Sequence, residues 1–401
     1  MIKNDLLKRI DLEKLYAEFK KLCFSDRRRS FLVAAIGFIV VAVILSISFV
    51  NKESMEEGVS AVSYSGESPS VETDVVEEEQ SDDQNIFERS YFLLSEVVPL
   101  GEIMDKVSVQ DKQRIFNIPE DFVSIQEAID AAVSGDAVFV SAGEYKGNIT
   151  MKDGVSLIGA GAENTILDGE KVGNVVAFKN IVDVDTRLEG FTIKNSEENL
   201  SGVMIEDSSP IINRNIILDN DYDIYIKGES SPTIQRNRLS SSKAGVQIFN
   251  LEKPNNSLPV IIDNFIFQNK KGINAYKANV KIEHNTISYN DSYGSYAGAT
   301  FGVYLTSGSA EIKNNIITDN GTCELCSGIY ADEKSSGVVI DYNNLWNNKN
   351  NFLCFGECKM LGNNFSGDSA FINAAEYDFS LSEDSPFLES GSDGKKLGSR
   401  I

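Results

Sequence analysis

The chain contains 401 residues, 42% of them hydrophobic and 24% charged, which is ample for a large buried core. Its formal net charge of −23 at pH 7 excludes nucleic acid and anionic membrane surfaces as expected partners of the folded part, because like charges repel. Neutral ligands and cations are compatible with this charge.

The N-terminal part differs from the rest in charge and hydropathy. Residues 1–30 are basic, with apolar residues at helical spacing, which predicts a cytoplasmic amphipathic helix that lies on the inner leaflet or caps the next segment. Residues 31–50 carry no charge and would span about 30 Å as a helix, so we predict a single transmembrane segment. Arginines before it and glutamates after it place the N-terminus inside and the C-terminal domain outside the cytoplasmic membrane. A cleaved signal peptide is the alternative, although the leader and the apolar run are longer than usual.

Two less regular segments lead to the folded domain. Residues 51–86 are acidic and poor in apolar side chains, which predicts a disordered linker. Residues 87–115 contain aromatic and leucine residues, which suggests a packed lead-in segment of unassigned structure. The domain itself is expected over 116–401. There Ser124 can cap a helix over 125–133 that covers an open end of the fold.

One short sequence motif occurs six times, with variations, between Gly202 and Asn348. Apolar and polar residues alternate in its first four positions, which is the period of a β-strand. A second apolar stretch then surrounds an asparagine. The copies begin at 202–205, 223–226, 245–248, 272–275, 302–305 and 328–331, and the recurring asparagines are Asn215, Asn237, Asn264, Asn285, Asn315 and Asn344.

The asparagines recur at intervals of 21 to 30 residues, and a repeat of this length marks stacked units that cannot close a core alone. No copy contains an apolar run long enough for a pair of helices. We therefore predict an all-β right-handed parallel β-helix in which each repeat forms one coil of three short strands. Coils stacked roughly 4.8 Å apart would align the asparagines into a ladder of hydrogen-bonded amides.

These repeats resemble the right-handed β-helix repeats of the pectin-lyase-like group over about residues 116–395. Some members of that group process polysaccharides and others are not known as hydrolases, so the resemblance specifies the fold better than the activity. The segment 369–391 resembles the closing segment of the family, which implies a final strand and a Ser-Pro turn that finish the stack.

The catalytic signatures of the group are largely missing. The Asn-Thr-Asp and Gly-His-Gly motifs of polygalacturonases are absent, and no pectinesterase set is found. The only histidine, His284, occupies a chemically variable position, so we expect a solvated side chain rather than a general acid or base. Glu206 and Asp332 lie five coils apart, about 24 Å, too far for glycoside hydrolysis. No catalytic residue is assigned.

The outward positions of the first strand are the better candidate for a binding surface. Tyrosines interleaved with hydrogen-bonding groups on a rigid sheet suit stacking against sugar rings, although aromatic residues also simply suit strands. The first outward row contains Met204, Tyr225, Gln247, Asn274, Tyr304 and Tyr330, and the second contains Glu206, Lys227, Phe249, Tyr276, Thr306 and Asp332. The candidate carbohydrate-binding residues are Tyr225, Lys227, Gln247, Asn274, Tyr276, Tyr304, Tyr330 and Asp332.

Four cysteines lie in two short motifs, Cys323-x2-Cys326 and Cys354-x3-Cys358, on loops of adjacent coils. A coil spacing near 4.8 Å suits disulfide geometry, so two cross-coil disulfides are expected outside the membrane. A four-thiolate zinc site and a redox-active Cys-x-x-Cys are the alternatives. No metal is assigned.

The pattern predicts a membrane-anchored β-helix that engages a neutral or weakly charged polysaccharide outside the cell. A carbohydrate-active lyase or hydrolase and a non-catalytic structural or adhesion scaffold are the alternatives. A polyanionic substrate would need Ca²⁺ or a local Lys/Arg cluster as a mediator, and no other cofactor is implied.

Overall fold

The computed structural model describes residues 113–252, 257–291 and 298–401. The predicted basic segment, transmembrane helix and acidic linker lie outside the described residues, as does nearly all of the predicted lead-in segment. Among the residues that the structure describes, no helix is both long enough and apolar enough to span a bilayer.

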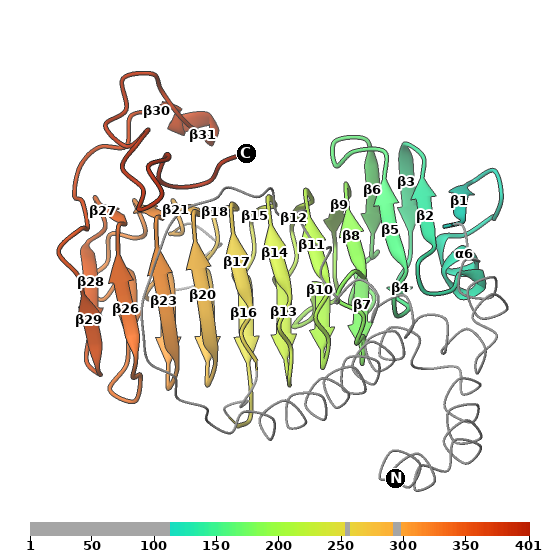
Figure 1. Ribbon diagram of the computed structural model, residues 1–401, viewed down its shortest axis with the longest axis horizontal. Coiled ribbons are helices and arrows are strands. Elements are labelled where there is room, and N and C mark those ends of the chain that lie inside the picture. Colours follow the sequence, from blue (N-terminus) through green and yellow to red (C-terminus); the bar gives the residue numbers. More distant parts are fainter. Residues whose placement is uncertain (1–112, 253–256, 292–297) are drawn as a thin grey trace, which may run out of the picture. The chain divides into compact units, whose positions relative to one another are not determined.

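The described chain winds through three parallel sheets, which confirms the predicted parallel β-helix (Figure 1). Sheet A is 11-stranded. Its strands are β1 (Ile115–Ile118), β2 (Ala137–Val140), β5 (Ser156–Gly159), β8 (Arg187–Glu189), β11 (Ile211–Asn213), β14 (Thr233–Gln235), β17 (Val260–Ile262), β20 (Asn279–Glu283), β23 (Ser309–Lys313), β26 (Val338–Asp341) and β29 (Cys358–Met360).

Sheets B and C contain nine strands each. Sheet B consists of β3 (Gly143–Lys146), β6 (Thr165–Asp168), β9 (Thr192–Lys194), β12 (Ile216–Leu218), β15 (Arg238–Ser240), β18 (Phe265–Phe267), β21 (Thr286–Ser288), β24 (Ile316–Thr318) and β27 (Asn344–Trp346). Sheet C consists of β4 (Ile149–Thr150), β7 (Val176–Lys179), β10 (Ser201–Glu206), β13 (Tyr222–Lys227), β16 (Ala244–Phe249), β19 (Lys271–Tyr276), β22 (Phe301–Thr306), β25 (Ser327–Ala331) and β28 (Asn350–Cys354).

The core runs along the axis of the coil as columns of aliphatic side chains. Because alternate residues of a strand face opposite sides, one residue in two points inward at the same register in every coil. Each inward side chain gains about 1.5–3 kcal/mol from burial. The column in sheet C contains Val203, Ile224, Val246, Ile273, Val303 and Ile329, all 0% exposed.

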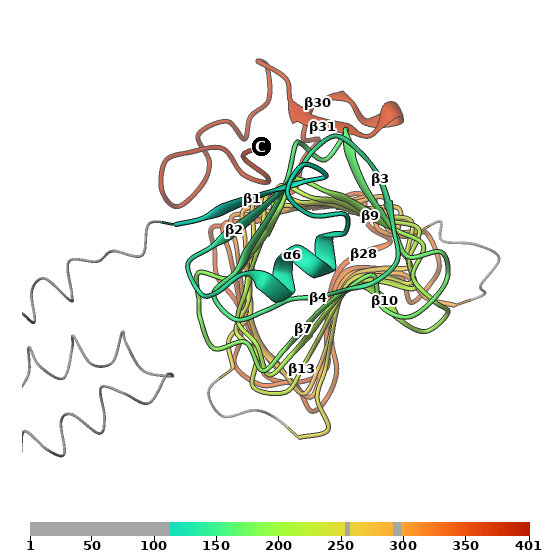
Figure 2. The same cartoon turned by 90° about the vertical axis from the view of Figure 1, so that its right-hand side faces the viewer.

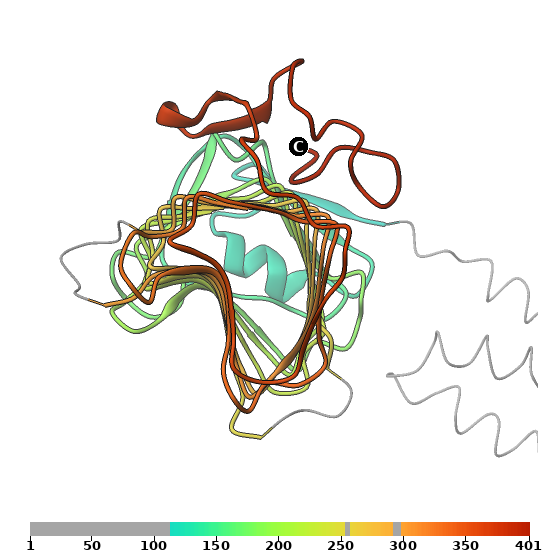
Figure 3. The same cartoon turned by 90° about the vertical axis from the view of Figure 1, so that its left-hand side faces the viewer.

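Sheet C has the longest strands of the repeats. Its strands β4, β7, β10 and β13 are labelled along the inward-bent side of the coil in Figure 2, and Figure 3 shows the same bend from the other end. A glycine begins the inward part of most of its strands because there is no room for a side chain. A Cβ at Gly302, for example, would lie 2.6 Å from the carbonyl oxygen of Gly328 and 3.0 Å from Asn320 Nδ2. The packing of sheet C therefore explains why most copies of the repeated motif begin with glycine.

An asparagine ladder runs along the turn between sheets A and B. Each side-chain oxygen accepts from the backbone N–H of the ladder asparagine one coil earlier, at 2.8–3.0 Å. The residue before each ladder position from Asn215 to Asn343 has a positive φ of 52–60°, which the amide hydrogen bonds help to hold. The ladder contains Asn215, Asn237, Asn264, Asn285, Asn315, Asn343 and Asn364.

The prediction was wrong for the last repeat, where Asn344 was expected in the ladder. Tyr342 takes the positive-φ position there, so the ladder amide belongs to Asn343. Asn344 begins strand β27, and its side chain donates instead to the carbonyl of Gly367 at 2.8 Å and to Ser369 Oγ at 3.0 Å.

A second ladder, not predicted, lies five residues further along each coil, at the turn between sheets B and C. It has the same geometry: Asn290 Nδ2 donates to Asn320 Oδ1 at 2.9 Å, and Asn320 Nδ2 donates to Asn348 Oδ1 at 3.0 Å. Its members are Asn220, Ser242, Asn269, Asn290, Asn320 and Asn348. The sequence signal is Asn-x4-Asn, which occurs in five coils and would also have selected Asn343 over Asn344.

The N-terminal end of the coil is covered by helix α6 (Ile125–Ala131), as Figure 2 shows. Ser124 accepts a hydrogen bond from the backbone N–H of Glu127 at 3.2 Å, as an N-cap residue should. Ile125, Ala128 and Ile129 are buried against the first coils. The helix was expected to reach residue 133 but ends at Ala131, because Ala132 is already extended.

The C-terminal segment does not finish the stack, contrary to the expectation for 369–391. Strands β30 (Phe371–Asn373) and β31 (Asp378–Leu381), joined by the 3-10 helix η1 (Ala374–Glu376), form an antiparallel pair outside the coil (Figure 1). Phe379 packs on Phe265 and Phe267 of sheet B. These two outward phenylalanines need an apolar cover, and the segment that folds back provides it.

Candidate functional site

The register of sheet C places the first outward row as predicted. We call these residues the tyrosine row. Successive members are direct Cα partners on neighbouring parallel strands, so the row is straight and advances by one coil at each step. The tyrosine row contains Met204, Tyr225, Gln247, Asn274, Tyr304 and Tyr330. Its role in binding sugar stays a prediction.

Two of the three aromatic rings of this row, those of Tyr304 and Tyr330, turn their faces toward each other. The rings of Tyr304 and Tyr330 are stacked, with centroids 4.9 Å apart and an interplanar angle of 13°. Phe301 also packs against both rings, at 4.5 Å and 5.4 Å. Because the ring faces contact one another along the axis, the outward groups are ring edges and hydroxyls. Tyr304 and Tyr330 therefore offer hydrogen bonding to a ligand, and stacking of sugar rings on this surface stays a prediction.

Tyr225 and Tyr330 are hydrogen-bond donors at neutral pH. Burial raises the pKa of the Tyr225 hydroxyl, with a smaller contribution from Tyr222. Burial also raises the pKa of Tyr330, with Tyr304 and nearby carboxylates acting in the same direction. Both groups therefore stay protonated well above pH 7.

Lys271 is a residue that sequence reasoning missed. It begins β19, and its ammonium lies 3.9 Å from the ring centroid of Tyr304 and 5.9 Å from that of Phe301. Burial, and next the positive charge of Lys270, lower its pKa to about 8. No carboxylate of the described residues acts on this pKa. The lysine is thus close to its titration point at neutral pH, inside the aromatic cluster.

Its position could not be recognised from the local sequence. Lys271 pairs in register with Phe301, which follows 30 residues later in the chain. The aromatic rings against which Lys271 is buried therefore come from the next coil. The repeated motif starts at the glycine, one residue after Lys271, so the pairing of Lys271 with Phe301 lies outside it.

The other candidate residues are already engaged with neighbours. Gln247 Oε1 accepts from Asn274 Nδ2 at 2.6 Å, which fixes both amides in the middle of the row. Lys227 forms an ion pair of 2.7 Å with Glu206. Tyr276 stacks on Phe249 with centroids 5.0 Å apart.

Asp332 lies in the turn after β25 rather than on the open sheet. Its Oδ1 accepts from the backbone N–H of Ser307 at 2.9 Å and from Ser335 Oγ at 2.7 Å. Those hydrogen bonds hold the turn, so Asp332 is better placed for structure than for ligand contact. With Glu206 held by Lys227, neither carboxylate is available as a hydrolytic acid or base.

The cysteines pair within each motif, so the expectation of cross-coil disulfides was wrong. Cys323 pairs with Cys326, with Cα atoms 5.0 Å apart, and Cys354 pairs with Cys358, with Cα atoms 6.4 Å apart. Each bond closes a small loop inside one coil. Among the described residues, no group of three or more His, Cys, Asp or Glu side chains is arranged to hold a metal ion.

His284 is buried, contrary to the expectation of a solvated side chain. It is 3% exposed because the C-terminal segment covers it, with Nε2 3.2 Å from Asn314 Nδ2 and 3.6 Å from Asp393 Oδ2. Burial lowers its pKa, and the charge of Arg400 acts in the same direction. It lies at the turn between sheets A and B, whereas the tyrosine row is on sheet C, so it takes no part in that surface.

Comparison with known proteins is consistent with this architecture. A family model described as the right handed beta helix region matches residues 153–302. No curated protein sequence matches. Similar solved structures include pectate lyase Pel9A, at 13% identity, with 71% of this chain and 96% of that chain covered and a TM-score of 0.44. Pectin methylesterase PemA from Erwinia chrysanthemi has 10% identity, 66% and 94% coverage and a TM-score of 0.33. The A-module of the Azotobacter vinelandii mannuronan C-5 epimerase AlgE6 has 16% identity, 63% and 99% coverage and a TM-score of 0.33. The described residues form a parallel β-helix, and the model of the right handed beta helix region matches its residues 153–302.

Proposed function

We propose that the tyrosine row of sheet C binds one polysaccharide chain lying along the axis of the coil. The observation that carries the proposal is the register, which lines up hydroxyls and amides at one position of successive parallel strands. From Tyr225 to Tyr330 the row makes four coil steps, or about 19 Å. A linear chain with regularly spaced hydroxyls can satisfy such a row.

The chemistry of the row favours a polar, hydroxyl-rich ligand. The protonated hydroxyls of Tyr225 and Tyr330 donate, while Asn274, held by the buried Gln247, lies in the middle of the row. Lys271 adds one positive charge that no described carboxylate offsets. This local charge also makes an acidic sugar compatible with a protein of strongly negative net charge.

A second candidate is β-elimination from a uronic-acid polymer, and the pKa of Lys271 favours it. A lysine with a pKa of about 8 is partly deprotonated near neutrality and can accept the proton next to a sugar carboxylate. The described residues offer no comparable pair of carboxylates for hydrolysis in this row. Lyase activity would appear as unsaturated products, and Lys271→Met would abolish it while leaving glycan binding measurable.

We also propose that residues 31–50 anchor this domain in the cytoplasmic membrane with the β-helix outside. The supporting observations are the uncharged run, the asymmetry of charge around it and the two disulfides of the folded part. Protease treatment of intact cells tests this topology. Digestion of the β-helix without cell lysis supports it, and protection until lysis contradicts it.

Binding is tested by presenting a glycan panel to the full-length protein and its hydroxyl-deletion variants. Tyr304→Phe and Tyr330→Phe keep the stacked rings but remove one hydroxyl each, so each should weaken binding about 2- to 10-fold. Tyr342→Phe, a tyrosine on the turn between sheets A and B, is the matched control and should bind normally. Equal affinities for all variants, or no glycan bound, would contradict the proposal.

A further inference from the structure

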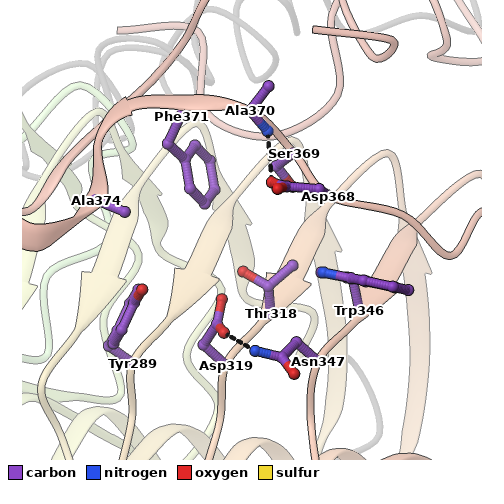
Figure 4. Close-up of a pocket in the computed structure, with 10 residues that line it drawn as sticks. All are labelled: Tyr289, Thr318, Asp319, Trp346, Asn347, Asp368, Ser369, Ala370, Phe371 and Ala374. Carbon is purple, nitrogen blue, oxygen red and sulfur yellow. Dashed lines mark hydrogen bonds between the residues drawn. The ribbon is translucent and has the colours of Figure 1, made fainter.

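A pocket of about 330 Å³ lies on a different side of the coil, beside the ends of three strands of sheet B (Figure 4). Its floor is formed at β21, β24 and β27, and residues 368–371 of the C-terminal segment cover it. This volume is near the lower end for ligand sites, which suits a single small ring rather than a polymer. Because the pocket lies at sheet B, it is separate from the proposed polysaccharide surface on sheet C.

The floor is built from the positive-φ positions that follow each strand of sheet B. Tyr289, Asp319 and Asn347 have φ values of 54°, 56° and 51°, and each comes directly before an asparagine of the second ladder. The ladder holds these turns alike, so the three side chains project from neighbouring coils in one column. A rigid backbone thus places an aromatic ring, a carboxylate and an amide side by side.

Aromatic side chains form the walls. Figure 4 shows Tyr289 and Trp346 on opposite sides of Thr318 and Asp319, with Phe371 above. Trp346, the only tryptophan in the chain, is 40% exposed. Exposed ring faces such as this one can contact the apolar side of a sugar ring or a cationic group.

Two carboxylates face the pocket without a cation among its lining residues. Asp319 Oδ1 accepts from Asn347 Nδ2 at 2.5 Å, and Asp368 Oδ1 accepts from the backbone N–H of Ala370 at 2.9 Å. Burial raises the pKa of Asp319, and the nearby charges of Asp368 and Asp291 raise it further. Burial also raises the pKa of Tyr289, and the charges of Asp319, Asp291 and Asp368 act in the same direction. The local field is negative, so a positive ligand charge would be stabilised.

We propose that this pocket binds an amine-bearing monosaccharide, an amino sugar whose ammonium group lies against Asp319 and Asp368. The aromatic walls, Tyr289, Trp346 and Phe371, contact the ring. Calcium fits less well, because it takes six to eight oxygen ligands and the described residues show no group of three acidic side chains here. The inference is independent of polysaccharide binding on sheet C.

The single tryptophan provides a readout that is confined to this pocket. Full-length protein is titrated with glucosamine, N-acetylglucosamine, glucose and CaCl₂ near neutral pH, with Trp346 emission as the signal. Glucosamine should give a saturable change, and the two uncharged sugars should bind at least about tenfold more weakly, because they lack the ammonium group.

Variants separate the pocket from general charge effects. Asp319→Asn and Asp368→Asn should each weaken glucosamine binding about tenfold or more. Asp185→Asn, which removes the same charge from an exposed position in another coil, should leave it unchanged. Unchanged melting temperatures would exclude misfolding as the cause of a loss.

Three results would overturn the proposal. They are equal affinity for glucosamine and glucose, a response to calcium but not to glucosamine, and no saturable change up to about 10 mM glucosamine. None of these results bears on the tyrosine row, because that surface lies on sheet C and contains no tryptophan. Loss of sheet C binding would likewise leave the Trp346 signal intact.

Discussion

Replacing Asn264 by alanine should remove a large polar contribution to stacking in the middle of the coil. Its Nδ2 donates to the carbonyls of Ile234 and Ile262 at 2.9 and 3.0 Å and to Asn285 Oδ1 at 2.9 Å. Its Oδ1 accepts from the backbone N–H and the Nδ2 of Asn237 at 2.9 and 3.0 Å. The side chain is 0% exposed, so water cannot replace these partners without opening the core.

The size of the effect follows from these five hydrogen bonds. Each contributes about 1 kcal/mol net, and a backbone N–H left buried without a partner costs about 1–3 kcal/mol. Some partners keep a second contact, so we expect Asn264→Ala to lower the free energy of unfolding by about 4 kcal/mol. Urea denaturation followed by circular dichroism measures this change.

A matched asparagine separates burial from residue type. Asn363 is exposed and makes one side-chain hydrogen bond, to Asp341 Oδ1 at 3.0 Å. Asn363→Ala should therefore cost less than about 1 kcal/mol. If both variants lost the same free energy of unfolding, or if Asn264→Ala cost less than about 1 kcal/mol, the ladder would contribute less to stability than its hydrogen bonds imply.

Three further predictions concern buried ionisable groups and disulfides. Asp223 takes the place of the sheet C glycine and is fully buried, with its pKa raised well above 3.8 by desolvation, and Ser242 replaces the ladder asparagine beside it. Because the folded state holds this proton more tightly, stability should fall as pH rises above about 4. The double variant D223G/S242N should remove that dependence and be more stable at pH 7 than either single variant, as urea titrations at several pH values would show. If the double variant and the unaltered protein showed the same dependence of stability on pH, the assignment to Asp223 would be contradicted. Burial lowers the pKa of His284, so the unfolded chain takes up its proton first, and stability should fall as pH drops below about 6.5. His284→Asn, which copies Asn314 one coil later, should flatten the loss between pH 7 and 5 in thermal melts, and an unaltered slope would be evidence against the buried state. The Cys354–Cys358 bond closes a loop of few residues, so C354A/C358A should cost about 2 kcal/mol in urea, and no change would rule out the pairing as a stabiliser.

The repeat pattern was sufficient to predict most of the coil because two local signals agree. Strand alternation fixes which residues of GVYL and its equivalents point inward, and the regular asparagines fix the turns, so the tyrosine row was placed in the register that sheet C shows. Asn344 was misassigned because two asparagines are adjacent and only one follows the positive-φ residue. The Asn-x4-Asn spacing resolves that ambiguity.

Features that depend on distant contacts could not be predicted in the same way. The fold-back of the C-terminal segment depends on Phe379 meeting Phe265 and Phe267, which lie more than a hundred residues earlier. The sequence around Phe265 and Phe267 does not indicate which distant segment covers them. The same fold-back buries His284 and completes the pocket beside Trp346.

The measurement that most directly tests binding along the coil is affinity as a function of oligosaccharide length. For a glycan found on the panel, the affinity should rise with each added sugar until the ligand spans about 19 Å, from Tyr225 to Tyr330, and then level off. A monosaccharide that binds as tightly as the longest oligomer would contradict the account, because one coil would then supply the whole site.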